Sequence, residues 1–130
     1  MNPAMRYCDS LFRYRRRLTR EVVVGDPVRG GVVIGGGHPV VMQSMLTCDT
    51  MDTGLCVRQT LDLVAAGCQL VRITAPTVRD AANLERIVAE LRGQDCRVPI
   101  VADIHFKPDA ALEAARWVEK IGRASWRESV

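Results

Sequence analysis

Polar side chains of types that do chemistry interrupt three otherwise apolar stretches of this 130-residue sequence. They are Gln43, Arg72, Asp103 and His105. A guanidinium in a buried strand needs an anion beside it, because burying an unpaired charge is strongly unfavourable. That anion is either Asp103 on a neighbouring strand or a group on an anionic substrate, most naturally a phosphate.

His105 and Gln43 each have a functional and a structural interpretation. Near a phosphate, an imidazole would donate a hydrogen bond or transfer a proton, whereas elsewhere His105 would be a structural core histidine. Gln43 would contact the same substrate or would only satisfy the polar end of a strand. The sequence predicts an anion site from these four residues and identifies no certain catalytic residue.

Three similar units must position these residues. Each has a short apolar run, a turn, and then apolar residues at helical spacing. The runs are Pro39–Met45, Cys68–Ala75 and Val98–Phe106, and their starts lie 29 and 30 residues apart. That period is typical of a strand followed by a returning helix, the unit of parallel α/β sheets.

Local signals mark the ends of the three predicted helices. Asp52 or Thr53 would cap the first helix, Gly67 would stop it, Gly93 would stop the second, and Pro108 would open the third. The apolar positions are, in order, Val57, Leu61, Val64 and Ala65; Ala81, Leu84, Val88 and Leu91; and Ala111, Ala114, Ala115, Val118 and Ile121.

Two short β-like stretches precede the units. Glu21–Gly25 and Val32–Gly35 are joined by a turn that contains Pro27 and two glycines, which predicts an antiparallel hairpin. Three glycines follow at 35–37, but no helix follows them, so a phosphate loop is not expected there.

Residue parity sorts the strand side chains into two faces. One face holds Val71 and Ile73 with Ile100, Ala102 and Ile104; the other holds Val41, Gln43 and Met45, then Leu70, Arg72 and Thr74, then Val101, Asp103 and His105. The second face changes from apolar to polar along each strand, as in a (β/α)₈ barrel, whose active site lies at the carboxyl end.

The predicted fold class is therefore α/β: the first three βα units of a (β/α)₈ TIM-type barrel, preceded by a β-hairpin, as an incomplete barrel. The expected domains are a basic lead-in over 1–20 and a partial barrel over 21–121. The hairpin occupies 21–36 and the three units occupy 39–121.

Composition limits the function classes. With 48% hydrophobic and 25% charged residues, the chain is ordinary for a globular protein, and no apolar run suffices for a membrane span. The net charge of +3 does not by itself indicate nucleic acid. Five cysteines without a C-x-x-C motif indicate reduced thiols that pack as small residues, no readable metal site and a cytosolic compartment.

Several motifs resemble one known family in order and spacing. They are Val41–Met45 (VMQSM), Asp49–Thr53 (DTMDT), Ala66–Ala75 (AGCQLVRITA), Val101–Phe106 (VADIHF) and Glu119–Ile121 (EKI). They resemble the N-terminal barrel of 4-hydroxy-3-methylbut-2-enyl diphosphate synthases, the flavodoxin- or ferredoxin-dependent enzymes of non-mevalonate isoprenoid biosynthesis. The Tyr14–Arg20 lead-in is similar to the larger, three-domain form.

The resemblance implies an iron–sulfur oxidoreductase that opens the ring of 2-C-methyl-D-erythritol 2,4-cyclodiphosphate by two-electron reduction and loss of a hydroxyl. It implies a homodimer whose active site closes between the barrel of one subunit and a C-terminal domain of the other. That domain carries a [4Fe–4S] cluster on three Cys and a Glu, to which none of the cysteines here corresponds. Arg72, Asp103 and His105 match the family's diphosphate end, and Gln43 is expected to join them. The resemblance also implies that the compartment is the bacterial cytoplasm, with a plastid as the less favoured alternative.

Two departures from the family matter. The family usually has Thr-Asn-Thr where this chain has Leu46-Thr47-Cys48. After Glu-Lys-Ile it continues Arg-Ile-Asn-Pro-Gly-Asn, with a fourth strand and another substrate-binding Arg, where this chain has the segment 122–130. We expect 122–130 to be an artefactual tail on a truncated enzyme, and the chain to be inactive alone.

Two rival interpretations remain. A pterin-binding barrel similar to dihydropteroate synthase shares the architecture, but its characteristic Asn and Asp loops are not visible. A small Arg-led nucleic-acid-binding module would use the basic lead-in, but 5% aromatic residues offer little stacking surface and the βα repeats stay unexplained. The resemblance predicts neither a nucleic-acid nor a membrane partner.

Overall fold

A computed structural model describes residues 8–10, 13–14 and 18–123. Its strands are β1 (Cys8–Ser10), β2 (Arg13–Tyr14), β3 (Val22–Val24), β4 (Val32–Ile34), β5 (Gln43–Met45), β6 (Leu70–Thr74), β7 (Ile100–Ile104) and β8 (Lys120–Arg123). Its helices are α1 (Thr53–Ala65), α2 (Val78–Gly93) and α3 (Pro108–Ala114), with a 3-10 turn over Pro27–Arg29. None of the helices in these ranges is long and apolar enough to cross a bilayer.

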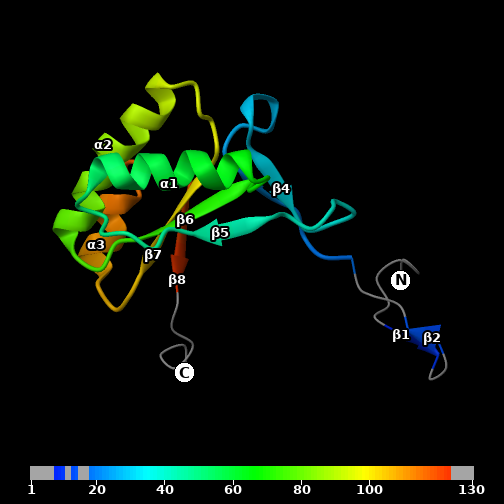
Figure 1. Cartoon of the computed structure of the whole chain (residues 1–130). Helices are drawn as coiled ribbons and strands as arrows, with labels where there is room; N and C mark the ends of the chain where they lie inside the picture. Colours follow the sequence, from blue (N-terminus) through cyan, green and yellow to red (C-terminus); the bar gives the residue numbers. More distant parts are fainter. Residues whose placement is uncertain (1–7, 11–12, 15–17, 124–130) are drawn as a thin grey trace.

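Four parallel strands form the central sheet, in the order β5-β6-β7-β8. The three helices lie on one face of it, and the hairpin β3–β4 lies at the end where β5 and β6 begin (Figure 1). The predicted α/β partial barrel with its preceding hairpin is confirmed: the described strands form an open sheet, not a closed barrel. In the lead-in, β1 and β2 pair with each other as a separate two-stranded sheet.

The core under the helices consists of the residues that parity predicts. Val71 and Ile73 of β6 and Ile100, Ala102 and Ile104 of β7 pack against buried residues of α1, α2 and α3. Leu84, Ile87 and Leu91 of α2 are fully buried there. Burial of such side chains stabilises the sheet by roughly 1.5–3 kcal/mol each, so this layer holds the strands in register.

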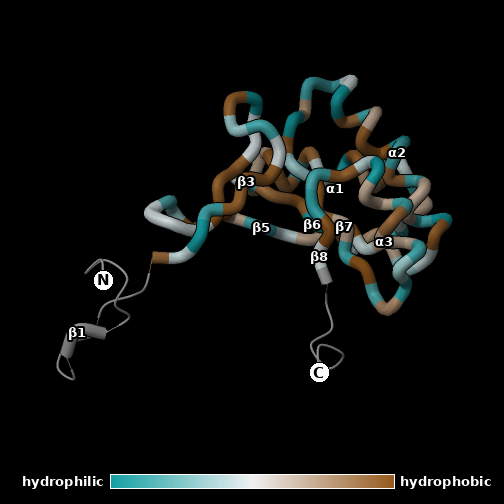
Figure 2. Tube along the Cα trace, turned by 180° about the vertical axis from the view of Figure 1, so that it is seen from behind, coloured by the Kyte–Doolittle hydropathy of each residue, from teal (hydrophilic) through white to brown (hydrophobic). Residues whose placement is uncertain are grey.

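The hairpin covers the beginning of the opposite face. Val24 and Val32 form a second apolar cluster with Leu70 and Val101, and Val41 packs against it. Figure 2 shows the apolar colouring of this part of the chain. Because these residues stand at the start of the strands, the hairpin covers part of the amino end of this face with apolar side chains.

Predicted helix ends agree with the observed ones for the first two helices. Asp52 caps α1 by accepting from the backbone N–H of Leu55 at 3.1 Å, and Gly67 follows with a φ of +104°. Thr77 and Asp80 form a capping box at the start of α2, which ends at Gly93. Side-chain acceptors satisfy N–H groups that a helix start leaves free.

The third helix is shorter than predicted. It ends at Ala114, and Ile121 lies in β8, because the chain must return to pair beside β7. Trp117 and Val118 pack against the core from the connecting turn, so their apolar character reflects burial rather than helical periodicity. β8 also crosses the boundary predicted after Ile121, and Gly122 pairs with Asp103. The remaining residues of the expected tail, 124–130, lie outside the described residues.

An ion pair between Arg92 and Glu119 lies at the amino end of β7. Arg92 near the end of α2 donates to the backbone carbonyls of Cys96 and Val98 and to Glu119 Oε1 at 2.5 Å. The second oxygen of Glu119 accepts from the buried backbone N–H of Ile100 at 2.8 Å. Glu119 therefore satisfies a charged and a neutral donor together, and connects α2 to the sheet.

Replacing Glu119 by Ala should lower the free energy of unfolding by about 2 kcal/mol, because the Ile100 N–H loses its acceptor and Arg92 its carboxylate. Urea unfolding followed by circular dichroism measures the change. The matched control is Glu90→Ala on the exposed face of α2, which should change stability by less than about 0.5 kcal/mol. Equal losses in the two variants would contradict the role of this pair.

Candidate functional site

Arg72, Asp103 and His105 come together at the carboxyl end of β6 and β7. The parallel register sets Arg72 beside Val101 and Thr74 beside Asp103, all on the face opposite the helices. Arg72 Nη2 donates to Asp103 Oδ1 at 2.8 Å, and Asp103 Oδ2 lies 3.4 Å from His105 Nε2. The Asp103 side chain is 4% exposed, Arg72 21% and His105 39%, so exposure rises from the carboxylate to the imidazole.

Asp103 therefore neutralises Arg72 in the salt bridge that the sequence analysis gave as one alternative. This salt bridge does not use all the N–H donors of Arg72. Arg72 Nε is buried and has no hydrogen-bond partner among the described residues. A guanidinium has five N–H donors in a planar fork, which matches the oxygens of a phosphate or carboxylate. The ion pair thus holds the guanidinium in place and leaves capacity for a further acceptor.

Two residues of β8 complete the surroundings. Lys120 is in register with Val101 and lies on the same face as Arg72, which adds a second cation. Gly122 is in register with Asp103, and a Cβ there would lie 3.0 Å from both Arg72 Nη2 and Val101 Cγ1. Because glycine has no side chain, the Arg72 guanidinium has room beside Gly122. Gly122 stands where the family resemblance would place an Arg.

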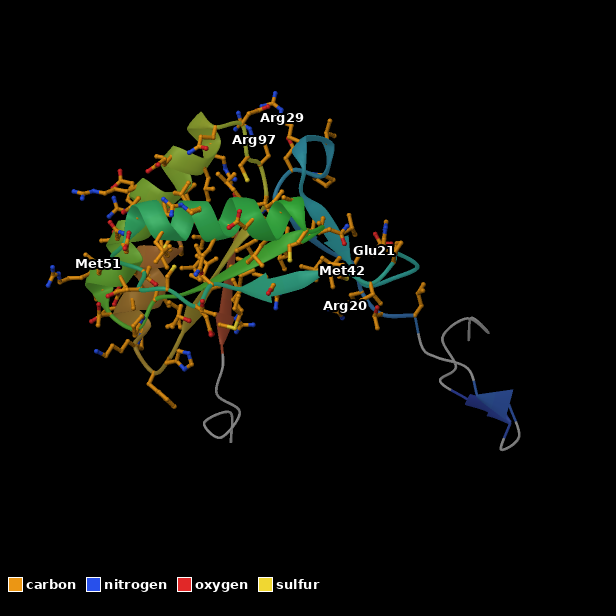
Figure 3. The ribbon with its side chains drawn as sticks, viewed as in Figure 1. Arg20, Glu21, Arg29, Met42, Met51 and Arg97 are labelled. Atoms are coloured by element: carbon orange, nitrogen blue, oxygen red, sulfur yellow. The ribbon has the colours of Figure 1, made fainter. Side chains whose placement is uncertain are left out.

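The structure does not bring Gln43 to the other three residues. Gln43 is exposed and in register with Leu70, two positions before Arg72 on β6. It lines a cavity of about 510 Å³ together with Thr19, Gly35 and Leu70, at the hairpin end of the sheet. Figure 3 shows Glu21 and Met42 at that end and Met51 at the opposite end of the molecule.

Sequence reasoning missed a polar network that positions the loop between β5 and α1. The Asn83 amide donates to Thr50 O at 2.7 Å and to Thr53 Oγ1 at 3.0 Å, and Thr50 Oγ1 donates to Thr74 O. Asn83 and Thr50 are both buried. The signal was available in principle: Asn83 interrupts the apolar face of the second helix, where a buried amide needs partners.

Charge favours an anion at this end of the sheet. Arg72 and Lys120 carry two positive charges on the inner face, whereas Asp103 carries one negative charge. His105 adds a further positive charge when it is protonated. This arrangement is suited to binding and orienting a phosphorylated ligand.

A metal ion or an iron–sulfur cluster needs a set of ligand side chains that lie close together. Within residues 18–122, no three His, Cys, Asp or Glu side chains gather into a group that could hold a metal ion. A cluster held by three Cys and a Glu would need ligands that this part of the chain does not bring together.

Comparison with known proteins identifies the fold and its relatives. The family described as the GcpE TIM-barrel domain matches residues 19–123. A 4-hydroxy-3-methylbut-2-en-1-yl diphosphate synthase (flavodoxin) of Akkermansia muciniphila is 59% identical over 115 residues, which cover 88% of this chain and 19% of that protein. The enzyme of the same name from Leptospira interrogans is 49% identical over 116 residues, covering 89% of this chain and 17% of that protein.

A ferredoxin form has a similar relationship to the chain. The 4-hydroxy-3-methylbut-2-en-1-yl diphosphate synthase (ferredoxin) of Synechococcus sp. (strain CC9311) is 42% identical over 110 residues, covering 84% of this chain and 26% of that protein. The chain therefore spans only about a sixth to a quarter of the length of these relatives.

Removing the carboxylate of Asp103 should destabilise the fold through Arg72. We expect Asp103→Ala to lower the free energy of unfolding by about 2 kcal/mol, because the guanidinium is left partly buried without its counter-ion. In an Arg72→Met background the same change should be milder, with a coupling of about 1 kcal/mol or more in the double-mutant cycle. Urea unfolding of the four proteins measures it. Strictly additive losses would show that the two side chains do not depend on each other.

Proposed function

The chain belongs to the GcpE TIM-barrel family, and from that premise we propose that it forms the diphosphate-binding part of a 4-hydroxy-3-methylbut-2-en-1-yl diphosphate synthase. The relatives that carry this name match 84–89% of the chain in the three comparisons above. The proposed substrate is 2-C-methyl-D-erythritol 2,4-cyclodiphosphate, and the proposed site consists of Arg72, Asp103 and His105.

Each residue has a distinct role in the proposed binding step. Arg72 donates to the diphosphate oxygens, and its charge offsets theirs. Asp103 is the positioning residue, because it holds one guanidinium nitrogen at 2.8 Å and leaves the others directed elsewhere. His105, which is partly exposed beside Asp103, donates to the same diphosphate from the adjacent turn. Lys120 contributes charge from β8.

Gln43 has a weaker place in this proposal. Its register beside Leu70 puts it nearer the amino end of the sheet than Arg72. A substrate that extends from the diphosphate toward the centre of a barrel would pass over this position. We therefore propose that Gln43 contacts the carbon portion of the substrate.

The reduction itself is assigned to groups outside this chain. A two-electron reduction needs a redox centre, which the family resemblance places as a [4Fe–4S] cluster in another domain. Flavodoxin or ferredoxin would supply the electrons to that cluster. We further propose a homodimer in the bacterial cytoplasm, in which the cluster domain of one subunit closes over the barrel of the other. We propose that the described residues bind the substrate, and we expect the chain to be inactive without the cluster domain.

One observation carries the proposal. Arg72 is held by Asp103 at the carboxyl end of the strands and still has a buried Nε donor without a partner. In parallel α/β folds this end of the sheet is where ligands bind. A guanidinium needed only for a structural salt bridge would be expected to have its buried donors satisfied.

Binding of inorganic pyrophosphate tests the anion site in the chain itself. Arg72→Met should weaken the binding at least about tenfold, since a charge-assisted pair of hydrogen bonds is lost. Isothermal titration calorimetry at low salt measures the affinity. The control is Arg79→Met, which removes an exposed arginine of α2 and should leave the affinity unchanged. An equal loss in both variants would mean only general charge attraction.

A chimera tests the proposed reaction. Residues 19–120 of this chain would replace the matching segment of the Akkermansia muciniphila relative, and reduction of the cyclodiphosphate would be followed with a chemical reductant. We expect the chimera to be active, and Arg72→Met within it to lower kcat/KM about a hundredfold or more, with Arg79→Met as the neutral control. A chimera that holds its full iron complement but does not turn over the cyclodiphosphate would contradict the proposal.

A further inference from the structure

Two cysteines that the proposed function does not use lie against each other. Cys48 stands in the loop between β5 and α1, and Cys56 lies in the first turns of α1. Their sulfur atoms are 3.4 Å apart, and both residues carry free thiols. Cys56 is fully buried, whereas Cys48 is partly exposed.

Hydrogen bonds on both sides of Cys48 hold this geometry. The backbone N–H of Thr47 donates to Gln59 Oε1 at 3.1 Å, and Gln59 Nε2 donates back to Thr47 Oγ1 at 3.3 Å. The Cys56 thiol donates to Asp49 O at 3.3 Å. Because the residues before and after Cys48 both bind α1, the sulfur of Cys48 is directed at that of Cys56.

We propose that Cys48 and Cys56 form an intramolecular disulfide on exposure to a hydroperoxide, which makes this pair a site of reversible oxidation. A disulfide requires a sulfur separation of about 2.05 Å, so the sulfurs must approach by little more than an ångström. The hydrogen bonds between the loop and α1 keep the two sulfur atoms close together. The inference is independent of the proposed diphosphate site.

The two thiols have different roles in the oxidation. Burial, the hydrogen bond with Cys48 and the neighbouring carboxylates together raise the pKa of the Cys56 thiol to about 12, so Cys56 remains a thiol at neutral pH. Cys48, which solvent reaches, is the sulfur that meets the oxidant first.

The reaction balances in two steps. The sulfur of Cys48 attacks the O–O bond of the hydroperoxide, and gives a sulfenic acid and one molecule of water or alcohol. The sulfur of Cys56 then attacks the sulfenic sulfur, and the S–S bond forms as the hydroxyl leaves as water with the Cys56 proton. The two sulfurs lose two electrons in total, and the peroxide gains them.

Oxidation would change the loop as well as the thiols. The Cys56 thiol would lose its proton and with it the donation to Asp49 O. The loop would instead be bound covalently to α1 beside Thr50, whose hydroxyl donates to the end of β6. Figure 3 labels Met51, three residues after Cys48, in this part of the molecule.

Peptide mapping of the full chain tests the proposal. Trypsin cleaves after Arg29 and Arg58, so the peptide 30–58 contains Cys48 and Cys56 and no other cysteine. Reduced protein would be treated with hydrogen peroxide, unfolded, alkylated with iodoacetamide and digested. We expect the peptide 30–58 to be recovered unalkylated and lighter by two hydrogens. This product should form at least about tenfold faster than Cys68 or Cys96 is oxidised.

Variants and a solvent control separate proximity from general reactivity. Cys48→Ser should leave Cys56 alkylatable after the same peroxide treatment, whereas Cys68→Ser, the matched control, should not change the oxidation of 30–58. The selectivity should disappear when the peroxide treatment is carried out in concentrated urea. A peptide 30–58 that stays doubly alkylated, an equal disulfide yield in urea, or disulfides mainly between chains would overturn the proposal.

Discussion

Placing a guanidinium on an inner strand of a sheet is the constraint that organises this molecule. Arg72 lies between apolar residues of β6, and its charge is tolerable there because Asp103 on the next strand accepts from it. That contact requires β6 and β7 to be parallel and in the observed register, which the helix-side core maintains. The structural and functional explanations of Arg72 are therefore compatible: the salt bridge fixes one nitrogen, and the remaining donors stay available for an anion.

The sequence predicted the elements and faces well because those signals are local. Alternation along β6 and β7 identified the core face, and capping residues marked the starts of α1 and α2. Register between strands is different, since it depends on how separate units pair. For that reason parity placed Gln43 on the correct face but could not show that it stands beside Leu70, below the level of Arg72. The same limit hid β8, whose short sequence has little apolar character and follows residues that fit a longer helix.

Polar contacts, together with the packing of Leu46 and Cys48 against the core, fix the loop between β5 and α1. Asn83 reaches it from α2 and Gln59 from α1, so that backbone carbonyls and amides of the loop are bound from two helices. Such a frame tolerates changes at the side chains between the anchoring residues. Cys48, which departs from the family's usual sequence, is one of those side chains, and its partner Cys56 belongs to the buried core. The loop thus holds the sulfur of Cys48 beside that of the buried Cys56.

The hairpin β3–β4 packs on only one end of the inner face of the sheet. Val24 and Val32 pack on Leu70 and Val101 at the beginning of the inner face, whereas Arg72 and Asp103 follow toward the carboxyl end. The hairpin therefore adds apolar burial at the beginning of the inner face, while the helix-side core runs along the full length of β6 and β7. Because that core does not depend on the inner face near the carboxyl end, substitutions there can accumulate during evolution while the sheet stays intact.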